Sequence, residues 1–145
     1  MSLSQLLVRC AWVPVVAALL VSCAGTPPAR HDAAERASFM AHAGQPVDRF
    51  MWLTSYRRST AISSDQVVVW TGLNEAYLVT VFHPCANLWF AHEIGFTHTG
   101  DNVYVHVNSV KADGWTCAIK TIQPVDYRRM QQDQQASRAT QTGSG

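Results

Sequence analysis

The stretch Ala76–Ala91, AYLVTVFHPCANLWFA, predicts the centre of the fold. Its first half, Tyr77 to Phe82, is mostly apolar and rich in β-branched and aromatic residues, which favours a buried strand. His83-Pro84-Cys85 predicts a corner after this strand, and a second apolar segment leaves that corner. The preceding run QVVVWT, residues 66–71, is separated from it by a turn at 72–75, so the two runs are expected to form a hairpin. Because neither run alternates strictly, both are expected to be covered on two faces, in mid-sheet or in a closed barrel.

Further short strands are predicted on both sides of this hairpin. One is expected within residues 47–56, and a last one within 115–122 after a turn at 111–114. Residues 92–97 and 103–107 are expected to pair across the turn Thr99-Gly100-Asp101-Asn102. The expected fold is mainly β, with about six short strands in a small antiparallel sheet closing into a barrel or sandwich and a short N-terminal helix. This β domain is placed at residues 46–127.

The segments flanking the β domain differ from it in composition. Residues 32–44 predict a short helix, with Asp32 as its N-cap and Gly44 and Pro46 ending it. Residues 23–31 contain small residues and two prolines and are interpreted as a tether. From residue 128 to residue 145 the sequence is polar and nearly free of apolar residues, which predicts a disordered tail.

The N-terminus has the pattern of an export signal. Arg9 precedes a 12-residue apolar run from Cys10 to Val21, which is too short to span a membrane and typical of a signal-peptide core. The run ends in Leu20-Val21-Ser22-Cys23, which resembles a bacterial lipobox. Residues 1–22 are therefore interpreted as a lipoprotein signal peptide and Cys23 as the lipidated residue. An ordinary secretory signal, cleaved after Ser22 or Ala24, is the alternative.

A lipidated Cys23 would attach the chain to a membrane through acyl chains such as palmitate, and several chains together give stable anchoring. Ala24 is not the aspartate that retains such lipoproteins at the inner membrane. By analogy, the periplasmic face of the outer membrane is the expected location. Loss of residues 1–22 removes one basic residue, Arg9, so the formal net charge of the 145-residue chain falls from +1 to zero. A neutral domain of this size lacks the basic surface that nucleic-acid binding requires, so nucleic acid is not an expected partner.

The four cysteines divide by position. Cys10 would be lost with the signal and Cys23 acylated, which leaves Cys85 and Cys117. Two cysteines in an oxidising compartment predict one disulfide between them, two buried free thiols being the alternative. Neither residue belongs to a CxxC motif, so a catalytic thiol is not indicated.

Several segments taken together resemble a known family. AHAGQPVDRF, VVVWTGLNEAYLV, PCANLWFAHEIGFT and CAIKTIQPVD, in this order and spacing over residues 41–126, are similar to an uncharacterised family of small proteobacterial lipoproteins. The resemblance implies an exported single domain with the lipobox and with paired cysteines at Cys85 and Cys117. It implies no activity.

Histidines are the first candidates for chemistry. Four of them fall within 24 residues: His83, His92, His98 and His106. A transition-metal site needs two or three imidazoles around one ion, and His92 and His98 lie too far apart on one strand to share one. A site using His106, Glu93 and His83 would require the hairpins to stack. Solvated histidines are the default expectation, and no cofactor or metal is predicted. Ser109, Asp113 and His106 lie close in sequence, but no nucleophile elbow surrounds the serine.

Aromatic residues are the other candidates. Most are expected to be core, but strands that are apolar on both sides leave room for a ligand or partner surface. The candidate binding surface consists of Trp70, Tyr77, Trp89 and Tyr104. The sequence thus predicts a lipid-anchored periplasmic envelope protein that acts as a structural or binding module, with the membrane and an envelope protein as partners. The alternative is an envelope hydrolase or metal-dependent enzyme using His83, His92 or His106.

Overall fold

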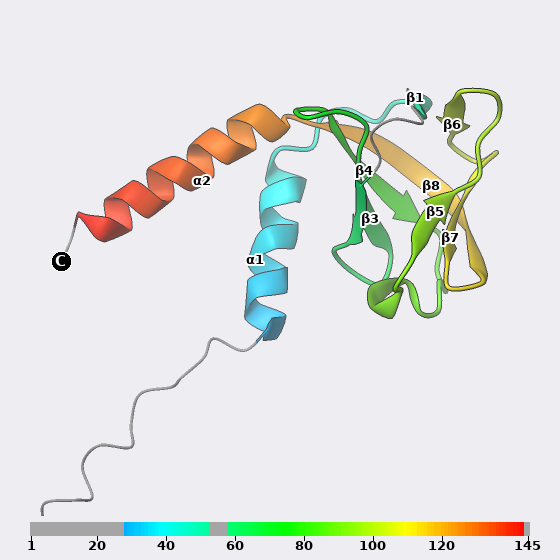
Figure 1. Ribbon diagram of the computed structural model, residues 1–145, viewed down its shortest axis with the longest axis horizontal. Helices are drawn as coiled ribbons and strands as arrows, with labels where there is room; N and C mark the ends of the chain where they lie inside the picture. The colour runs from blue at the N-terminus through cyan, green and yellow to red at the C-terminus, as the bar shows by residue number, and fades with distance from the viewer. Residues whose placement is uncertain (1–27, 53–57, 144–145) are drawn as a thin grey trace, which may run out of the picture.

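The computed structural model describes residues 28–52 and 58–143, and the side chains from residue 33 onward within them. The predicted signal peptide, residues 1–22, and the predicted lipidation site, Cys23, lie outside the described residues. Two helices lie on the same side of a small β domain (Figure 1). In chain order the elements are α1 (Pro28–Ala41), β1 (Arg49–Met51), β2 (Arg58–Ala61), β3 (Gln66–Trp70), β4 (Ala76–Val81), η2 (Leu88–Phe90, a 3₁₀ turn), β5 (Ile94–Phe96), β6 (Asn102–Tyr104), β7 (Ser109–Ala112), β8 (Trp115–Val125) and α2 (Tyr127–Thr142).

Six strands form one antiparallel sheet in the order β2-β3-β4-β8-β7-β5, and the sheet curls until it is nearly closed into a barrel. The predicted β3–β4 hairpin is confirmed, with Val67 opposite Val79 and Val69 opposite Tyr77. β4, the first part of the stretch Ala76–Ala91, lies between β3 and β8 at the centre of the sheet, as predicted. The mainly β fold class is therefore confirmed.

Both faces of the central strands are buried. We call the cluster inside the barrel the inner core; it contains Phe50, Trp52, Val67, Val69, Val79, Val81, Cys85, Leu88, Phe96, Val103, Val110, Ala112, Cys117, Ile119 and Ile122. The outer core lies between the outer face of β3 and β4 and the two helices, and contains Phe39, Ile62, Val68, Trp70, Ala76, Leu78, Val125 and Met130. All five residues of β3 are buried for this reason, which explains their lack of alternation.

Strand β8 pairs with both β4 and β7, and its pairing with β4 contains a register shift. Thr80 of β4 is opposite Thr121, but the next residue, Val81, is opposite Ile119, so one residue of β8 bulges out. A bulge changes which face a side chain occupies. Ile119 and Ile122 are three positions apart and would lie on opposite faces of a regular strand. Because of the bulge, both lie in the inner core.

The predicted pairing of residues 92–97 with 103–107 is wrong. β5 pairs with β7, and β6 pairs with β1, with Phe50 opposite Val103. The alternation from Val103 to Val107 does not continue as a strand, because His106 has a φ of 60° and the side chain of Asn108 accepts a hydrogen bond from the Tyr104 backbone N–H, 2.8 Å. Val107 is 70 % exposed as a result.

The predicted disordered tail is also wrong, because α2 is helical to Thr142. Asp126 caps this helix by accepting a hydrogen bond from the Arg129 N–H, 3.1 Å. Its glutamines, alanines and arginines have good helix propensity, and Met130 anchors its first turns in the outer core. The prediction of disorder was based on the low hydrophobicity of this segment, but a polar segment with a good cap can still form a helix.

The N-terminal helix was predicted at residues 32–44 but runs from Pro28 to Ala41, so Asp32 is not its cap. Proline is favoured in the first turn of a helix, where its missing N–H has no partner to lose. Residues 28–31 of the predicted tether are thus helical. Phe39 is buried against Trp70 and Tyr127, which fixes α1 and the start of α2 to the sheet. None of the described helices is long and apolar enough to cross a membrane.

Candidate functional site

The two ends of the barrel differ in construction. At one end, which we call the disulfide end, lie the turn at 62–65, the corner at 83–85, η2 and the β7–β8 turn at 113–114. At the opposite end lie the β3–β4 turn at 71–75, the end of β8 and the junction of the two helices. The candidate site is built at the disulfide end.

The predicted disulfide between Cys85 and Cys117 is confirmed. The Cα atoms are 5.7 Å apart, and both residues are buried in the inner core. The bridge joins the corner after β4 to the first part of β8. It therefore fixes the segment that leads into η2 against the sheet.

A groove lies at the seam where the two edge strands of the sheet, β2 and β5, approach each other. The Ser59 hydroxyl donates a hydrogen bond to the backbone carbonyl of Ile94, 2.9 Å, in the position where a backbone ladder would close the barrel. The groove has a volume of about 310 Å³ and is lined by Ser59, Thr60, Ala61, Trp89, Ala91, His92 and Ile94. Its lining combines hydroxyl groups with an indole and an imidazole, which suits a mixed polar and apolar ligand surface.

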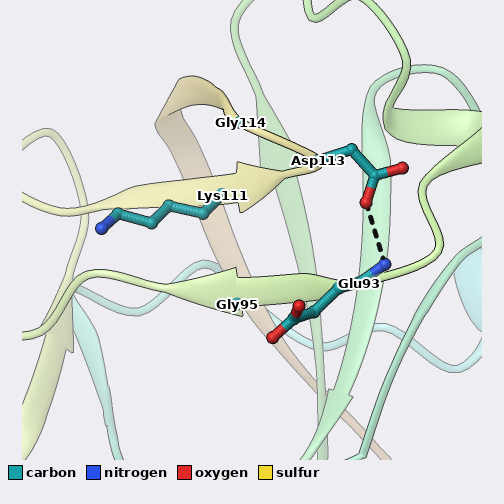
Figure 2. Close-up of a pocket in the computed structure, with 5 residues that line it drawn as sticks. All are labelled: Glu93, Gly95, Lys111, Asp113 and Gly114. Atoms are coloured by element: carbon teal, nitrogen blue, oxygen red, sulfur yellow. Dashed lines mark hydrogen bonds between the residues drawn. The ribbon is translucent and has the colours of Figure 1, made fainter.

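A second hollow, of about 260 Å³, lies beside the β7–β8 turn and is lined by Glu93, Gly95, Lys111, Asp113 and Gly114 (Figure 2). The Asp113 carboxylate accepts hydrogen bonds from the backbone N–H groups of His92, 3.0 Å, and Glu93, 3.1 Å. These bonds, together with a contact from the His92 ring, hold the pKa of the Asp113 carboxyl below its usual value. In Figure 2 the charged ends of Lys111, Glu93 and Asp113 point in different directions. The hollow thus lacks the converging charges that acid–base catalysis needs.

The histidines do not converge either. His83 faces Asp65 at 3.4 Å, and His92 faces Asp113 at 3.3 Å. The ring of His98 contacts the Gly100 carbonyl, 2.8 Å, and the ring of His106 lies against Phe82. Within residues 28–52 and 58–143, no group of three or more histidine, cysteine, aspartate or glutamate side chains is arranged to hold a metal ion. The alternative enzyme based on His83, His92 or His106 therefore gains no support from the geometry.

One cluster contains a serine, an aspartate and a histidine in the wrong order for catalysis. The Ser63 hydroxyl donates to Asp65, 2.6 Å, and Asp65 lies between this hydroxyl and His83. In a nucleophile triad the imidazole lies in the middle and accepts the serine proton. Burial alone would raise the pKa of the Asp65 carboxyl, but the Ser63 hydrogen bond and the charges of His83 and Arg36 lower it. The cluster stabilises the β2–β3 turn.

The four aromatic residues of the candidate binding surface are not on one surface. Trp70 is 5 % exposed in the outer core, and the Arg58 guanidinium covers its ring at 4.9 Å. Tyr77 stacks on Phe50 and donates to Glu75, and burial with this carboxylate raises the pKa of Tyr77 to about 12. Tyr104 lies on β6 under the Arg49 guanidinium. Trp89, by contrast, lines the groove at the β2–β5 seam.

Sequence reasoning missed a further cluster at the opposite end. His42 donates to the Ser38 carbonyl through Nδ1, 2.8 Å, and faces the Asp133 carboxylate through Nε2, 2.9 Å. Both oxygens are hydrogen-bond acceptors, so the two contacts are made together when each ring nitrogen carries a proton. The hydrogen bond to Asp133 is the main reason that the pKa of His42 is raised, while the charge of Arg129 opposes it. The pair joins α1 to α2, a contact that only the helical state of residues 127–142 creates.

Fold and site together define a small disulfide-bonded domain, with a nearly closed six-stranded antiparallel barrel, two packed helices and an open groove at the barrel seam. The chain belongs to a family of unknown function, DUF6491, whose family model matches residues 7–141. This match includes both helices as well as the barrel. No curated protein and no solved structure shows a significant match to the chain.

Proposed function

We propose that this protein is an exported, lipid-anchored envelope protein whose barrel binds another envelope protein through the groove between β2 and β5. The observation that carries the binding role is this groove, which combines two sheet edges with Trp89 and His92. The candidate catalytic histidines His83, His92 and His106 contact different partners and do not converge. The family match shows that the chain belongs to a family of unknown function, and the binding role goes beyond that match.

Export is supported by two independent features. The apolar run at 10–21 followed by Leu20-Val21-Ser22-Cys23 has the form of a lipoprotein signal. The Cys85–Cys117 disulfide is typical of proteins that mature in an oxidising compartment such as the periplasm. Acyl chains on Cys23 would then attach the protein to the membrane, and the outer membrane is the location that the residue Ala24 favours.

The chemistry of the groove favours a protein side chain as its occupant. The Trp89 ring is half-buried, so it is held in place and still offers apolar surface. The His92 side chain is 96 % exposed and offers a polar contact at the rim of the groove. An anchored aromatic residue with polar groups around it is the usual arrangement of a protein-binding hot spot.

The test is cross-linking of the full-length protein in intact cells, followed by capture through a C-terminal tag and mass spectrometry. Trp89→Ala and His92→Ala change the groove, and the second substitution leaves the core untouched because its side chain is solvent-exposed. Tyr104→Ala and His98→Ala are matched controls, one half-buried aromatic and one exposed histidine outside the groove. Thermal unfolding of each variant shows that the fold is kept.

The proposal expects the groove variants to lose the same cross-linked protein that the control variants retain. A cross-linked protein that is lost equally in all four variants, or lost only with Tyr104→Ala, would place the binding surface elsewhere and contradict the proposal. Retention of every cross-link by the His92→Ala and Trp89→Ala forms would contradict it as well.

A further inference from the structure

Exposed aromatic side chains gather toward one end of the barrel. Three aromatic residues are among the large hydrophobic side chains exposed in the described part of the chain: Phe82, Phe90 and Trp115, exposed by 46, 76 and 52 %. Phe90 lies in η2, Trp115 begins β8 directly after the β7–β8 turn, and Phe82 precedes the corner at 83–85. All three therefore lie toward the disulfide end. At the opposite end, the exposed large hydrophobic residue of the β3–β4 turn is aliphatic, Leu73.

Helix α1 points its N-terminus toward this same end. Near its C-terminal end, the Gly44 N–H donates to the Pro124 carbonyl, 2.7 Å, close to the end of β8. In its middle, the Arg36 side chain donates to Gln66, 2.8 Å, at the start of β3. Because β3 starts at the disulfide end, α1 runs from the disulfide end to the opposite end. Figure 1 shows the same arrangement, with the first turn of α1 and the β7–β8 turn both at the bottom.

The chain length between the proposed anchor and α1 is short. Only four residues, 24–27, separate Cys23 from Pro28, the first residue of α1. Whatever conformation they adopt, five Cα–Cα steps span at most roughly 18 Å. The helix itself, 14 residues long, rises about 20 Å from its first residue to its last. An anchor at Cys23 would therefore hold the N-terminal end of α1, and with it the disulfide end, close to the bilayer.

We propose that the disulfide end rests on the bilayer surface, with Phe90 and Trp115 inserted at the level of the lipid headgroups. The proposal rests on the lipid anchor at Cys23 proposed above. Tryptophan and phenylalanine side chains are favoured at this interface, because a large ring gains from leaving water while the indole N–H keeps a polar partner. The orientation also brings the β2–β5 groove near the membrane, since Ala61 and Ile94 lie at the disulfide end of their strands. The protein that the groove binds is then one embedded in, or attached to, the same membrane.

The charged residues near these aromatic side chains indicate the headgroup charge of the lipid that this end contacts. Glu93 and Asp113 lie beside the β7–β8 turn with one lysine, Lys111. The β7–β8 turn that precedes Trp115 therefore has no excess of positive charge to attract anionic headgroups. We expect contact with a zwitterionic surface, driven by the aromatic rings and independent of salt.

The test uses the mature lipidated full-length protein, reconstituted in vesicles of phosphatidylcholine whose acyl chains carry bromine. Bromine quenches tryptophan fluorescence only at short range, so quenching reports insertion. Flotation of the vesicles first shows whether the protein is attached. Trp115→Phe removes the reporting indole and keeps an aromatic ring, and Phe90→Ser removes the neighbouring anchor. Leu73→Ser is the matched control, because Leu73 is 78 % exposed at the opposite end.

We expect the protein to float with the vesicles and its fluorescence to be quenched at low and high salt alike. The quenched component should decrease in Trp115→Phe and in Phe90→Ser and remain unchanged in Leu73→Ser. A protein that floats but shows equal quenching in wild type and Trp115→Phe would overturn the orientation and leave the anchor intact. A protein that does not float would overturn both.

Discussion

Removal of the Cys85–Cys117 disulfide should reduce the stability of the domain severely. The bridge closes a loop with a sequence separation of 32 residues. A cross-link of this length limits the conformations of the unfolded chain, and the chain-entropy relation gives a stabilisation of about 3–4 kcal/mol. Small domains have a total free energy of unfolding of only about 5–15 kcal/mol, so this is a large share.

The measurement is urea unfolding of the purified mature protein with the bridge oxidised and reduced. Trp52 lies in the inner core and Trp70 in the outer core, so intrinsic fluorescence follows the unfolding of both. Reduction alone removes the cross-link and keeps both sulfur atoms in place. The double variant Cys85→Ala/Cys117→Ala additionally loses their packing, so it should be less stable than the reduced wild type. A loss on reduction below about 1 kcal/mol would refute the reasoning, because the unfolded chain would then gain little freedom.

Three further substitutions test the packing, the C-terminal helix and the contact between the helices. Phe50→Ala, at a residue 2 % exposed in the inner core, should cost about 3–5 kcal/mol in urea unfolding, while Met51→Ala next to it should change stability by no more than about 0.5 kcal/mol. Asp126→Ala should lower the helix signal in circular dichroism and cost about 1 kcal/mol, and Asp126→Asn, which keeps the cap, should not. The pKa of His42 is raised above 6.5 in the folded state, so its interaction with Asp133 is fully present below pH 6.5 and lost as the pH rises through the folded-state pKa. The free energy of unfolding should therefore be higher for wild type than for His42→Gln at acidic pH, by at most about 1 kcal/mol, and this difference should disappear at alkaline pH. A difference that does not change with pH would contradict the interaction of protonated His42 with Asp133.

The centre of the fold could be predicted from the sequence because it is formed by segments that are neighbours along the chain. The turn at 72–75 lies between two runs rich in β-branched residues, so the β3–β4 hairpin follows from neighbouring residues alone. The pairing of Cys85 with Cys117 followed from the small number of cysteines. The burial of both faces of β3 followed from its continuous apolar run.

The pairing of the short strands could not be predicted in the same way. Phe50 and Val103 lie opposite each other although they are far apart in sequence, and no local turn joins their strands. The alternation from Val103 to Val107 suggested a longer strand, but the positive φ of His106 and the side chain of Asn108 end it. Long-range packing thus decided which of several apolar segments became neighbours.

The candidate site was predicted only in part for the same reason. Trp89 and His92 were both selected from the sequence, but for different roles, and their common groove depends on Ser59 reaching Ile94 from 35 positions away. Trp70 and Tyr77 were predicted to share one surface, but they point to opposite faces of the sheet. Trp70 belongs to the outer core, and Tyr77 packs against the inner core. The contact of His42 with Asp133 was not expected at all, because it requires a helix where a disordered tail was predicted.

The central claim is that the mature protein begins at a lipidated Cys23 and is held at the membrane by it. The most direct measurement is mass spectrometry of the N-terminal peptide of the protein purified from the cell envelope. The proposal predicts a peptide that begins with Cys23 and carries the mass of its acyl chains, and a Cys23→Ser form that is no longer acylated or anchored. A mature chain that begins at Gly25, or an unmodified Cys23, would contradict the lipoprotein assignment.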